Sequence, residues 1–163
     1  MRTRIFVVLL IAMPFEGAAR PLPLFAMQAI TPTAPGLNFG SISPASGSSC
    51  NIDISSNVSG DCDLSDGNIR TGQLQISSLL SNTSVQIQVT GTDNGQLSFI
   101  STTGISGAVG GPSTVSDDTP ALVTTDGAGS PIDLIIYGQM NVVTDISPGG
   151  SFSVSYNVSV TYP

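Results

Sequence analysis

The stretch Gly150-Ser-Phe-Ser-Val-Ser-Tyr-Asn-Val-Ser-Val-Thr-Tyr162-Pro163 alternates without a break between polar and apolar side chains. Its apolar positions are Phe152, Val154, Tyr156, Val158, Val160 and Tyr162. Successive side chains of a β-strand point to opposite faces, so the stretch predicts a strand with one buried face, whereas a helix would scatter the same residues around its circumference. At about 3.4 Å per residue it would span roughly 40 Å, about twice the usual strand length.

Shorter stretches with the same period of two fill most of the remaining chain. They lie at 51–55, 73–77, 84–90, 97–100, 121–124 and 132–143. A first strand is expected at 36–43, loops with at most a short edge strand at 101–118, and a hairpin with a type I′ turn at Asn94-Gly95. No window beyond the first residues shows the apolar spacing of a helix. The pattern predicts an all-β fold, an immunoglobulin-like β-sandwich of about seven to nine strands.

The first residues have the features of a secretory signal peptide: a basic start at 1–4, an apolar stretch at 5–15 and small residues at 17–19. An apolar stretch of this length is shorter than the roughly 20 residues that a membrane-spanning helix needs, so a membrane anchor is the weaker interpretation. Cleavage after Ala19 and cleavage after Ala29 both fit. Residues 1–29 are therefore assigned to a signal peptide and Pro-rich leader, and residues 30–163 to a single domain with no membrane span.

Charged residues are sparse, and most of them are acidic. The 163 residues include four Arg, no Lys, no His and eleven acidic residues, for a formal net charge of −7. Removal of residues 1–29 would leave Arg70 against ten Asp, a net charge of −9. Phosphate backbones would repel such a chain, so we expect no nucleic-acid partner.

Catalytic groups are also scarce. A serine nucleophile needs a base, and the sequence contains neither His nor Lys. The adjacent Asp117 and Asp118 could formally act as the two carboxylates of a hydrolase, although neighbouring loop aspartates are more often solvated turn residues. We therefore expect that the protein is not an enzyme and binds no cofactor.

Cys50 and Cys62 are the only cysteines. In an exported chain we expect them to form a disulfide, which would stabilise the fold by about 3 kcal/mol through loop closure. A zinc site would need further ligands. Asp61, Asp63 and Asp66 resemble a calcium loop, because oxygen ligands recur at short spacing. The spacing is off by one residue and no bidentate Glu follows, so a turn rich in aspartate is the preferred interpretation and a calcium site the alternative.

The C-terminal stretch carries a resemblance to a known family. Counted back from Pro163, Tyr162 is the penultimate residue, Gly150 is the fourteenth, and apolar residues hold the even places between them. This arrangement resembles the C-terminal signature of chaperone–usher pilins. Residues 132–162, together with Leu37-Asn-Phe-Gly40, also resemble the spore coat protein U group of secreted bacterial β-domains. The resemblance implies a sandwich that lacks its final strand and is completed by a donor strand from another chain.

In such a fold the last strand borders a strand-acceptor groove. The resemblance assigns to this groove Gly150, Phe152, Val154, Tyr156, Val158, Val160 and Tyr162. It implies a periplasmic chaperone and an usher as partners, followed by like or related subunits that supply the donor strand. Possible donor residues are Leu22, Leu24, Ala26 and Ile30. Pro21 and Pro23 lie among them and lack an N–H group, which limits how this segment can pair.

From these features we expect a structural subunit of a bacterial surface fibre or coat, assembled by β-strand complementation. It would pass through the periplasm to the cell surface or the medium. The alternative is a self-complete secreted adhesin or matrix-binding module. A mature chain that starts at Arg20 would keep the donor segment, and one that starts at Ile30 would lack it.

Overall fold

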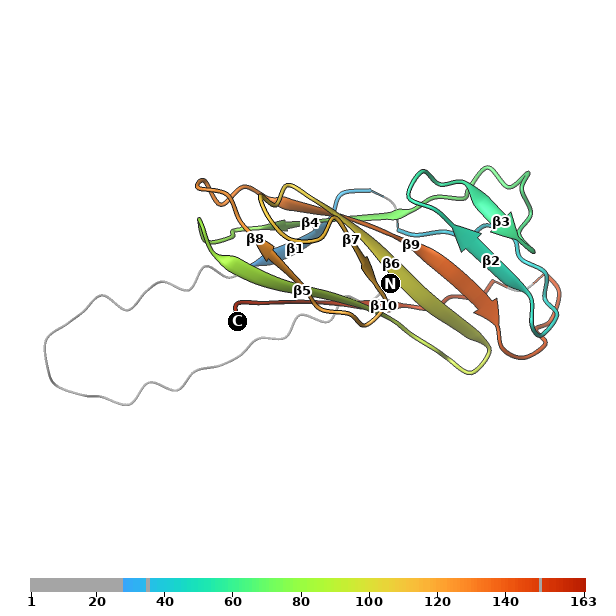
Figure 1. The fold of residues 1–163 in the computed structure, drawn as a ribbon. Coiled ribbons are helices and arrows are strands. Elements are labelled where there is room, and N and C mark those ends of the chain that lie inside the picture. Colours follow the sequence, from blue (N-terminus) through green and yellow to red (C-terminus); the bar gives the residue numbers. More distant parts are fainter. Residues whose placement is uncertain (1–27, 35, 150) are drawn as a thin grey trace, which may run out of the picture.

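The computed structural model describes residues 28–34, 36–149 and 151–163. Within these ranges every regular element is a β-strand and no helix is present, which confirms the all-β prediction. The strands are β1 (Ala29–Pro32), β2 (Ser49–Ile52), β3 (Val58–Gly60), β4 (Gly72–Ser77), β5 (Ser84–Gly91), β6 (Leu97–Ser106), β7 (Thr114–Ser116), β8 (Ala121–Thr124), β9 (Ile132–Val142) and β10 (Tyr156–Thr161). They form two antiparallel sheets of an elongated β-sandwich (Figure 1).

The centre of the larger sheet is β9. One of its edges pairs with β6, which also pairs with β7. The other edge pairs first with β4 and then with β2, and these two strands carry β1 and β3. The arm formed by β2 and β3 lies at the end of the sandwich opposite to the C-terminus (Figure 1).

The smaller sheet contains three strands in the order β10-β5-β8. Both pairings are antiparallel, so β5 is the central strand. The outer edge of β8 is partly covered, because the main chain at Val109 and Gly110 bonds to Thr124. Among the described residues no strand pairs with the outer edge of β10.

The core between the sheets is built from aliphatic side chains at alternate strand positions. The largest fully buried ones are Ile52, Ile76, Ile87, Ile132, Leu134 and Ile136. Burial of one such side chain contributes about 1.5–3 kcal/mol. The period of two in the sequence therefore corresponds to the face that each strand turns to the core.

The closing strand is shorter than the sequence predicted. Of the strand expected over Gly150–Tyr162, only β10 forms a ladder, residues 151–155 form none, and Gly150 lies outside the described residues. The cause is the last residue of β5. A Cβ atom at Gly91 would overlap the carbonyl oxygen of Phe99, so only glycine allows β5 to approach β6 there. Beyond Gly91 the chain pairs with β6. Residues 151–155, which we call the closing segment, therefore have no main-chain partner in β5.

The N-terminal edge of the larger sheet also differs from the prediction. No strand forms at 36–43, where Asn38 and Ile42 make only single bridges, to Arg70 and Cys62. Instead β1 pairs with β4 in the Pro-rich stretch, and it begins at Ala29, a residue assigned to the leader. β1 is only four residues long and ends on Pro32, so no alternating pattern predicted it.

Two local features of the larger sheet also differ from the prediction. The hairpin at Asn94-Gly95 is present, but only Gly95 has a positive φ, +84°, so the predicted type I′ turn is wrong. The Asn94 side chain instead accepts hydrogen bonds from the N–H groups of Gln96 and Leu97, at 3.0 and 2.8 Å. β6 continues into residues that were expected to form a loop, because β9 supplies a partner along its whole length.

The predicted disulfide between Cys50 and Cys62 is present, with a Cα–Cα distance of 5.2 Å. It joins β2 to the residues that follow β3, so it fastens the β2–β3 arm across its own hairpin. The Cys50 side chain is fully buried in the core. The disulfide therefore anchors the Asp-rich loop at residues 61–68 to the sandwich.

Candidate functional site

Two edges of the sandwich face each other without pairing. One is β10, and the other is the N-terminal edge, which we define as β1 together with residues 33, 34 and 36–43. The hydroxyl group of Tyr156 lies beside Gly72 at the start of β4, and that of Tyr162 accepts a 2.9 Å hydrogen bond from the N–H group of Leu80 beyond its end. β10 therefore runs in the same direction as β4 and opposite to β1.

The main chain of β10 leaves three residues unpaired on its outer edge. Alternate residues of an antiparallel strand direct both N–H and C=O to the same neighbour. The Val89 carbonyl accepts a 3.0 Å hydrogen bond from the Asp118 N–H group on the β8 side of β5, so Val89 does not bond to β10. Val158 lies opposite Val89 in the register. Val158, and with it Tyr156 and Val160, thus point both main-chain groups away from β5.

These three residues also turn their side chains toward the core. Tyr156, Val158 and Val160 are half-buried and pack against it, while Asn157 and Ser159 between them are exposed. Burial is incomplete because no strand lies beyond β10 to cover them. A strand placed along this edge would find main-chain hydrogen-bonding groups and apolar side chains at the same positions.

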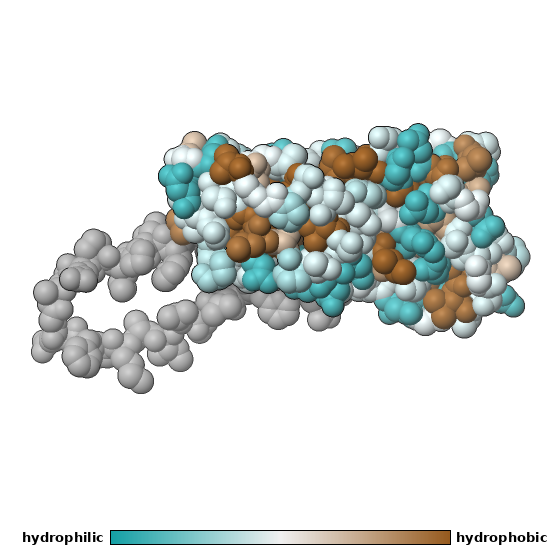
Figure 2. All heavy atoms as spheres, viewed as in Figure 1, coloured by the Kyte–Doolittle hydropathy of each residue, from teal (hydrophilic) through white to brown (hydrophobic). Residues whose placement is uncertain are grey.

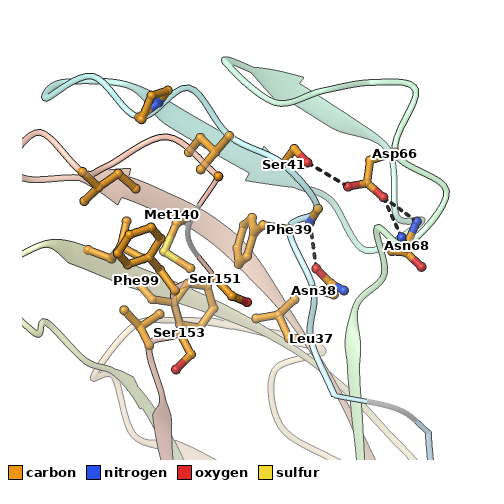
Figure 3. A pocket seen from close by; sticks show the side chains of 18 of the residues that line it. Leu37, Asn38, Phe39, Ser41, Asp66, Asn68, Phe99, Met140, Ser151 and Ser153 are labelled. Carbon is orange, nitrogen blue, oxygen red and sulfur yellow. Dashed lines mark hydrogen bonds between the residues drawn. The ribbon is translucent and has the colours of Figure 1, made fainter.

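A cavity of about 550 Å³ opens between the N-terminal edge and residues 146–149, 151–154 and 156. Core side chains form its floor, namely Phe39, Leu97, Phe99 and Met140. The Phe39 and Phe99 rings meet edge to face, with centroids 5.6 Å apart. Figure 3 shows Leu37 and Phe39 reaching the cavity from the N-terminal edge and Ser151 and Ser153 from the closing segment. Its volume is in the range of about 300–1,000 Å³ that is typical of ligand pockets.

Tyr156 bounds this cavity and bridges the two sheets. Its ring centroid lies 6.3 Å from that of Phe99. A Cβ atom at Gly72 would be 3.1 Å from the Tyr156 hydroxyl oxygen and 3.3 Å from Leu37, so the phenol fits against β4 because residue 72 has no side chain. Burial raises the pKa of the Tyr156 hydroxyl above its ordinary value.

Side chains of the β5–β6 hairpin hold the closing segment in place. The Thr92 hydroxyl donates to the carbonyl of Ser155 and accepts from its N–H group at 3.1 Å. The Asn94 amide donates to the Ser153 carbonyl at 3.1 Å. Phe152 keeps 39% of its surface exposed at the mouth of the cavity. The segment is tied to the sandwich at single points, so its position depends on these two side chains.

The three aspartates of the possible calcium loop bond to separate backbone segments: Asp61 to the start of β2, and Asp63 and Asp66 to turns of their own. Asp61 accepts from the Ser49 N–H group at 2.9 Å, Asp63 from that of Ser65 at 2.9 Å, and Asp66 from that of Asn68 at 3.0 Å. Hydrogen bonds from the hydroxyl and N–H groups of Ser65 lower the pKa of Asp63. Hydrogen bonds from the N–H group and side chain of Asn68 lower the pKa of Asp66. Within residues 28–34, 36–149 and 151–163, no group of three His, Cys, Asp or Glu residues is arranged to hold a metal ion.

Asp66 also borders the cavity. One of its carboxylate oxygens accepts a 3.1 Å hydrogen bond from the Ser41 hydroxyl (Figure 3). Asn38 and Asn68 add amide groups to the same polar rim. The cavity therefore combines an aromatic and aliphatic floor with a polar rim on the side of the N-terminal edge.

The neighbouring Asp117 and Asp118 have different surroundings. Asp117 accepts hydrogen bonds from the N–H groups of Gly91 and Ser101, at 2.7 and 3.1 Å, and from the Ser101 hydroxyl. Asp118 accepts from the side chains of Gln88 and Thr90, both at 2.9 Å. Asp117 thus fixes the crossing of β5 onto β6, while Asp118 binds exposed side chains of β5.

Most of the predicted groove residues lie together in the structure, whereas most of the predicted donor residues lie outside the described residues. Val154, Tyr156, Val158, Val160 and Tyr162 all pack against the core along one side of the sandwich, with Phe152 more exposed at its end. The predicted signal peptide and the donor residues Leu22, Leu24 and Ala26 lie outside the described residues. Ile30 is described, and it pairs with Ile76 as part of β1 in its own chain.

The sequence did not reveal the residues that complete the site from other strands. Phe99 and Met140 occupy ordinary inward positions of β6 and β9, and Gly72 precedes an alternating stretch without any special pattern. Their role depends on contacts between distant strands. The Leu37-Asn-Phe-Gly40 stretch, which carries part of the resemblance, does contribute, because Leu37 and Phe39 line the cavity.

The visible face of the sandwich is mixed in character. Figure 2 shows hydrophobic residues in several separate clusters among neutral and hydrophilic ones. In the part of the chain that the structure describes, no helix is long and apolar enough to cross a membrane.

The fold and the site define an all-β sandwich with an open apolar edge. Comparison with known proteins adds no relative, since no protein-family model, curated protein or solved structure matches the chain.

Proposed function

We propose that this protein is a structural subunit of a bacterial surface fibre or coat, and that it assembles by accepting a β-strand from another chain along β10. One observation carries the proposal. Tyr156, Val158 and Val160 combine unpaired main-chain groups with half-buried apolar side chains. Strand addition uses this combination, because main-chain hydrogen bonds give affinity and alternate side chains fill pockets.

The cavity beside Tyr156 supports the same proposal. It lies in line with β10, between the closing segment and the N-terminal edge, and its floor is apolar. A strand that continued past Tyr156 would place further side chains over Phe39 and Phe99. The gain would come from covering the half-buried side chains of Leu37, Val154 and Tyr156, since the floor residues are already buried.

The proposed route includes partners that protect this edge. An unpaired apolar strand is a site of aggregation unless it is covered. We propose that a periplasmic chaperone covers β10 during export, with an usher as a further partner, and that a like or related subunit then takes its place at the cell surface. The signal-peptide features and the C-terminal resemblance support this route, which involves no catalysis.

Residue-resolved hydrogen exchange tests the proposal directly. In the isolated protein we expect fast exchange at the amides of Tyr156, Val158 and Val160, and slow exchange at Asn157 and Ser159, which bond to β5. In the assembled form all five should be protected. Equal protection of the five amides in the isolated protein would contradict an open edge.

A proline substitution tests the same edge without disturbing β5. Val158→Pro removes an N–H group that makes no bond in the isolated domain, and edge positions of this kind tolerate proline. We expect a folded monomer that no longer assembles in size-exclusion chromatography. Ser159→Ala, on the outer face, is the matched control and should assemble normally. Assembly of Val158→Pro and of Val160→Pro at wild-type level would refute the proposal.

A second candidate function is a self-complete adhesin or matrix-binding module. It is favoured by the contacts of Tyr156 with Gly72 and of Tyr162 with Leu80, which fasten β10 to the opposite sheet within one chain. The cavity would then take a ligand instead of a strand. A monomer that stays soluble and protected at the β10 amides without any chaperone would support this alternative.

A further inference from the structure

The tip of the β5–β6 hairpin carries the one Asn-Gly pair of the sequence, Asn94-Gly95. It lies between Asp93 and Gln96, and all four residues are exposed to solvent. We propose that Asn94 is a self-modification site, at which the folded chain converts its own asparagine side chain to a carboxylate and so loosens the closing segment. This inference goes beyond the proposed function, because it holds whichever partner the open edge of β10 takes.

The chemistry is an attack of a main-chain nitrogen on the neighbouring side chain. The nitrogen of Gly95 loses its proton and bonds to Cγ of Asn94, which closes a succinimide ring. The bond between Cγ and Nδ2 breaks, and Nδ2 leaves as ammonia after it takes up the proton. Water then opens the ring at either carbonyl and leaves aspartate or isoaspartate. The reaction consumes only water, and it is easiest before glycine, since a Cβ atom on the attacking residue would hinder the approach.

Asp93 is placed to take the proton from the attacking nitrogen. The N–H group of Gly95 donates a 2.6 Å hydrogen bond to a carboxylate oxygen of Asp93. A general base must lie within hydrogen-bond reach of the proton that it removes, and this distance meets the requirement. Asp93 therefore acts as the general base, and it returns the proton to the leaving ammonia.

The Asn94 side chain is held as the electrophile. Its carbonyl oxygen accepts hydrogen bonds from the N–H groups of Gln96 and Leu97, at 3.0 and 2.8 Å. Two main-chain donors on one carbonyl oxygen stabilise the negative charge that develops there during the attack, as in an oxyanion hole. The amide nitrogen donates to the Ser153 carbonyl at 3.1 Å. Because an N–H group only donates and a carbonyl only accepts, these partners fix which end of the amide is the oxygen.

Contacts with residues that follow β9 hold the hairpin tip in this arrangement. The Val143 N–H group donates to the Gln96 carbonyl at 2.8 Å, and the Thr144 hydroxyl donates to the Gly95 carbonyl at 3.4 Å. Gly95 has a φ of +84°, a conformation that glycine adopts without strain. An unfolded chain keeps the Asn-Gly pair but none of these contacts. The folded state should therefore accelerate the reaction.

The product changes a contact that holds the closing segment. An aspartate at residue 94 keeps one oxygen for the two N–H groups of the turn, so the hairpin can persist. Toward Ser153 it presents a negatively charged oxygen instead of an N–H group, and this oxygen repels the Ser153 carbonyl. What remains is the contact of the Thr92 hydroxyl with Ser155. Modification therefore loosens the closing segment, and with it Phe152 at the mouth of the cavity.

The rates in the folded and in the unfolded protein test the site. The full chain would be incubated near neutral pH with and without urea. Peptide mass spectrometry would follow the replacement of the Asn94 amide by a carboxylate, with isoaspartate included. We expect conversion to be at least about tenfold faster in the folded protein, since the base and the two N–H donors act only there. An equal or slower rate in the folded protein overturns the inference.

Asp93→Asn separates the base from the turn. An amide oxygen can still accept from the Gly95 N–H group but does not take its proton, so we expect the folded variant to convert about tenfold more slowly. In urea the substitution should change little. Asp145→Asn is the matched control, because it removes an equal charge from another exposed aspartate that accepts a main-chain hydrogen bond. A wild-type rate in folded Asp93→Asn, or the same slowing in urea, refutes the role of the base. Should this variant fail to fold, the wild-type comparison decides.

Limited proteolysis tests the consequence. Chymotrypsin cleaves after exposed aromatic residues, and Phe152 is 39% exposed. We expect cleavage there to be about three- to tenfold faster in Asn94→Asp, which carries the product side chain, because one hydrogen bond to the segment is lost. Asn51→Asp, the same change at an exposed position of β2, is the control and should be cleaved like the wild type. Equal cleavage of the two variants contradicts the inference. Normal assembly of Val158→Pro would refute the proposed function and leave this inference standing.

Discussion

The hydroxyl oxygen of Tyr156 lies so close to Gly72 that a Cβ atom at residue 72 would be 3.1 Å from it. Residue 72 begins β4 in one sheet and residue 156 begins β10 in the other, so this contact spans the open side of the sandwich. It sets the position of β10 relative to the N-terminal edge, and it separates the large cavity from the rest of that side.

Gly72→Ala should therefore disturb the open side. The added methyl group would push against the Tyr156 hydroxyl and Leu37, and we expect a loss of about 1–2 kcal/mol in the free energy of unfolding measured with urea. Gly67→Ala, where an added Cβ meets no atom within 4 Å, is the control and should change stability little. Tyr156→Phe in the Gly72→Ala background should restore part of the loss. Strict additivity of the two substitutions would contradict the contact.

Tyr156 should also make stability depend on alkaline pH. Burial raises its pKa in the folded state above the value of about 10 in the unfolded chain, so its contribution is complete below pH 10 and is lost as the pH rises through the folded pKa. We expect urea midpoints to fall above pH 10 in the wild type and to fall less steeply in Tyr156→Phe. Identical slopes in the two proteins would show that the phenol is not desolvated.

Asp117 should be important for stability in spite of its loop position. Asp117→Ala leaves the Gly91 and Ser101 N–H groups without their acceptor and the buried Ser101 hydroxyl with the Val89 carbonyl alone, which predicts a loss of about 2–4 kcal/mol. Asp117→Asn keeps one acceptor oxygen and should lose less. Thermal unfolding followed by circular dichroism measures both, and equal losses would show that an acceptor oxygen at this position does not account for the contribution of Asp117.

Removal of the disulfide should destabilise the fold without abolishing it. Replacement of Cys50 and Cys62 by Ala opens a local loop, and the expected loss is about 2–3 kcal/mol in the free energy of unfolding. The Asp-rich loop at 61–68 should become the first site of proteolysis, since the bond anchors it to β2. Cleavage that begins elsewhere would contradict this role.

Individual strands show which parts of the fold the sequence predicted. The alternation at 73–77, 84–90 and 121–124 predicted β4, β5 and β8 almost to the residue, because those strands bury one face and expose the other. It failed for β1, which is four residues long and ends on Pro32. It also failed at residues 151–155, where the alternating pattern continues although the partner strand has left.

The alternating sequence by itself determined that this chain forms β-strands and which side chains of β10 face the core, because strand geometry links position to face. Only the tertiary structure decided which edge of β10 stays unpaired and what lies across from it. Those depend on Gly91, where β5 crosses to β6, and on the fit of Tyr156 against Gly72. Both are close approaches between distant segments, which a local sequence pattern does not encode.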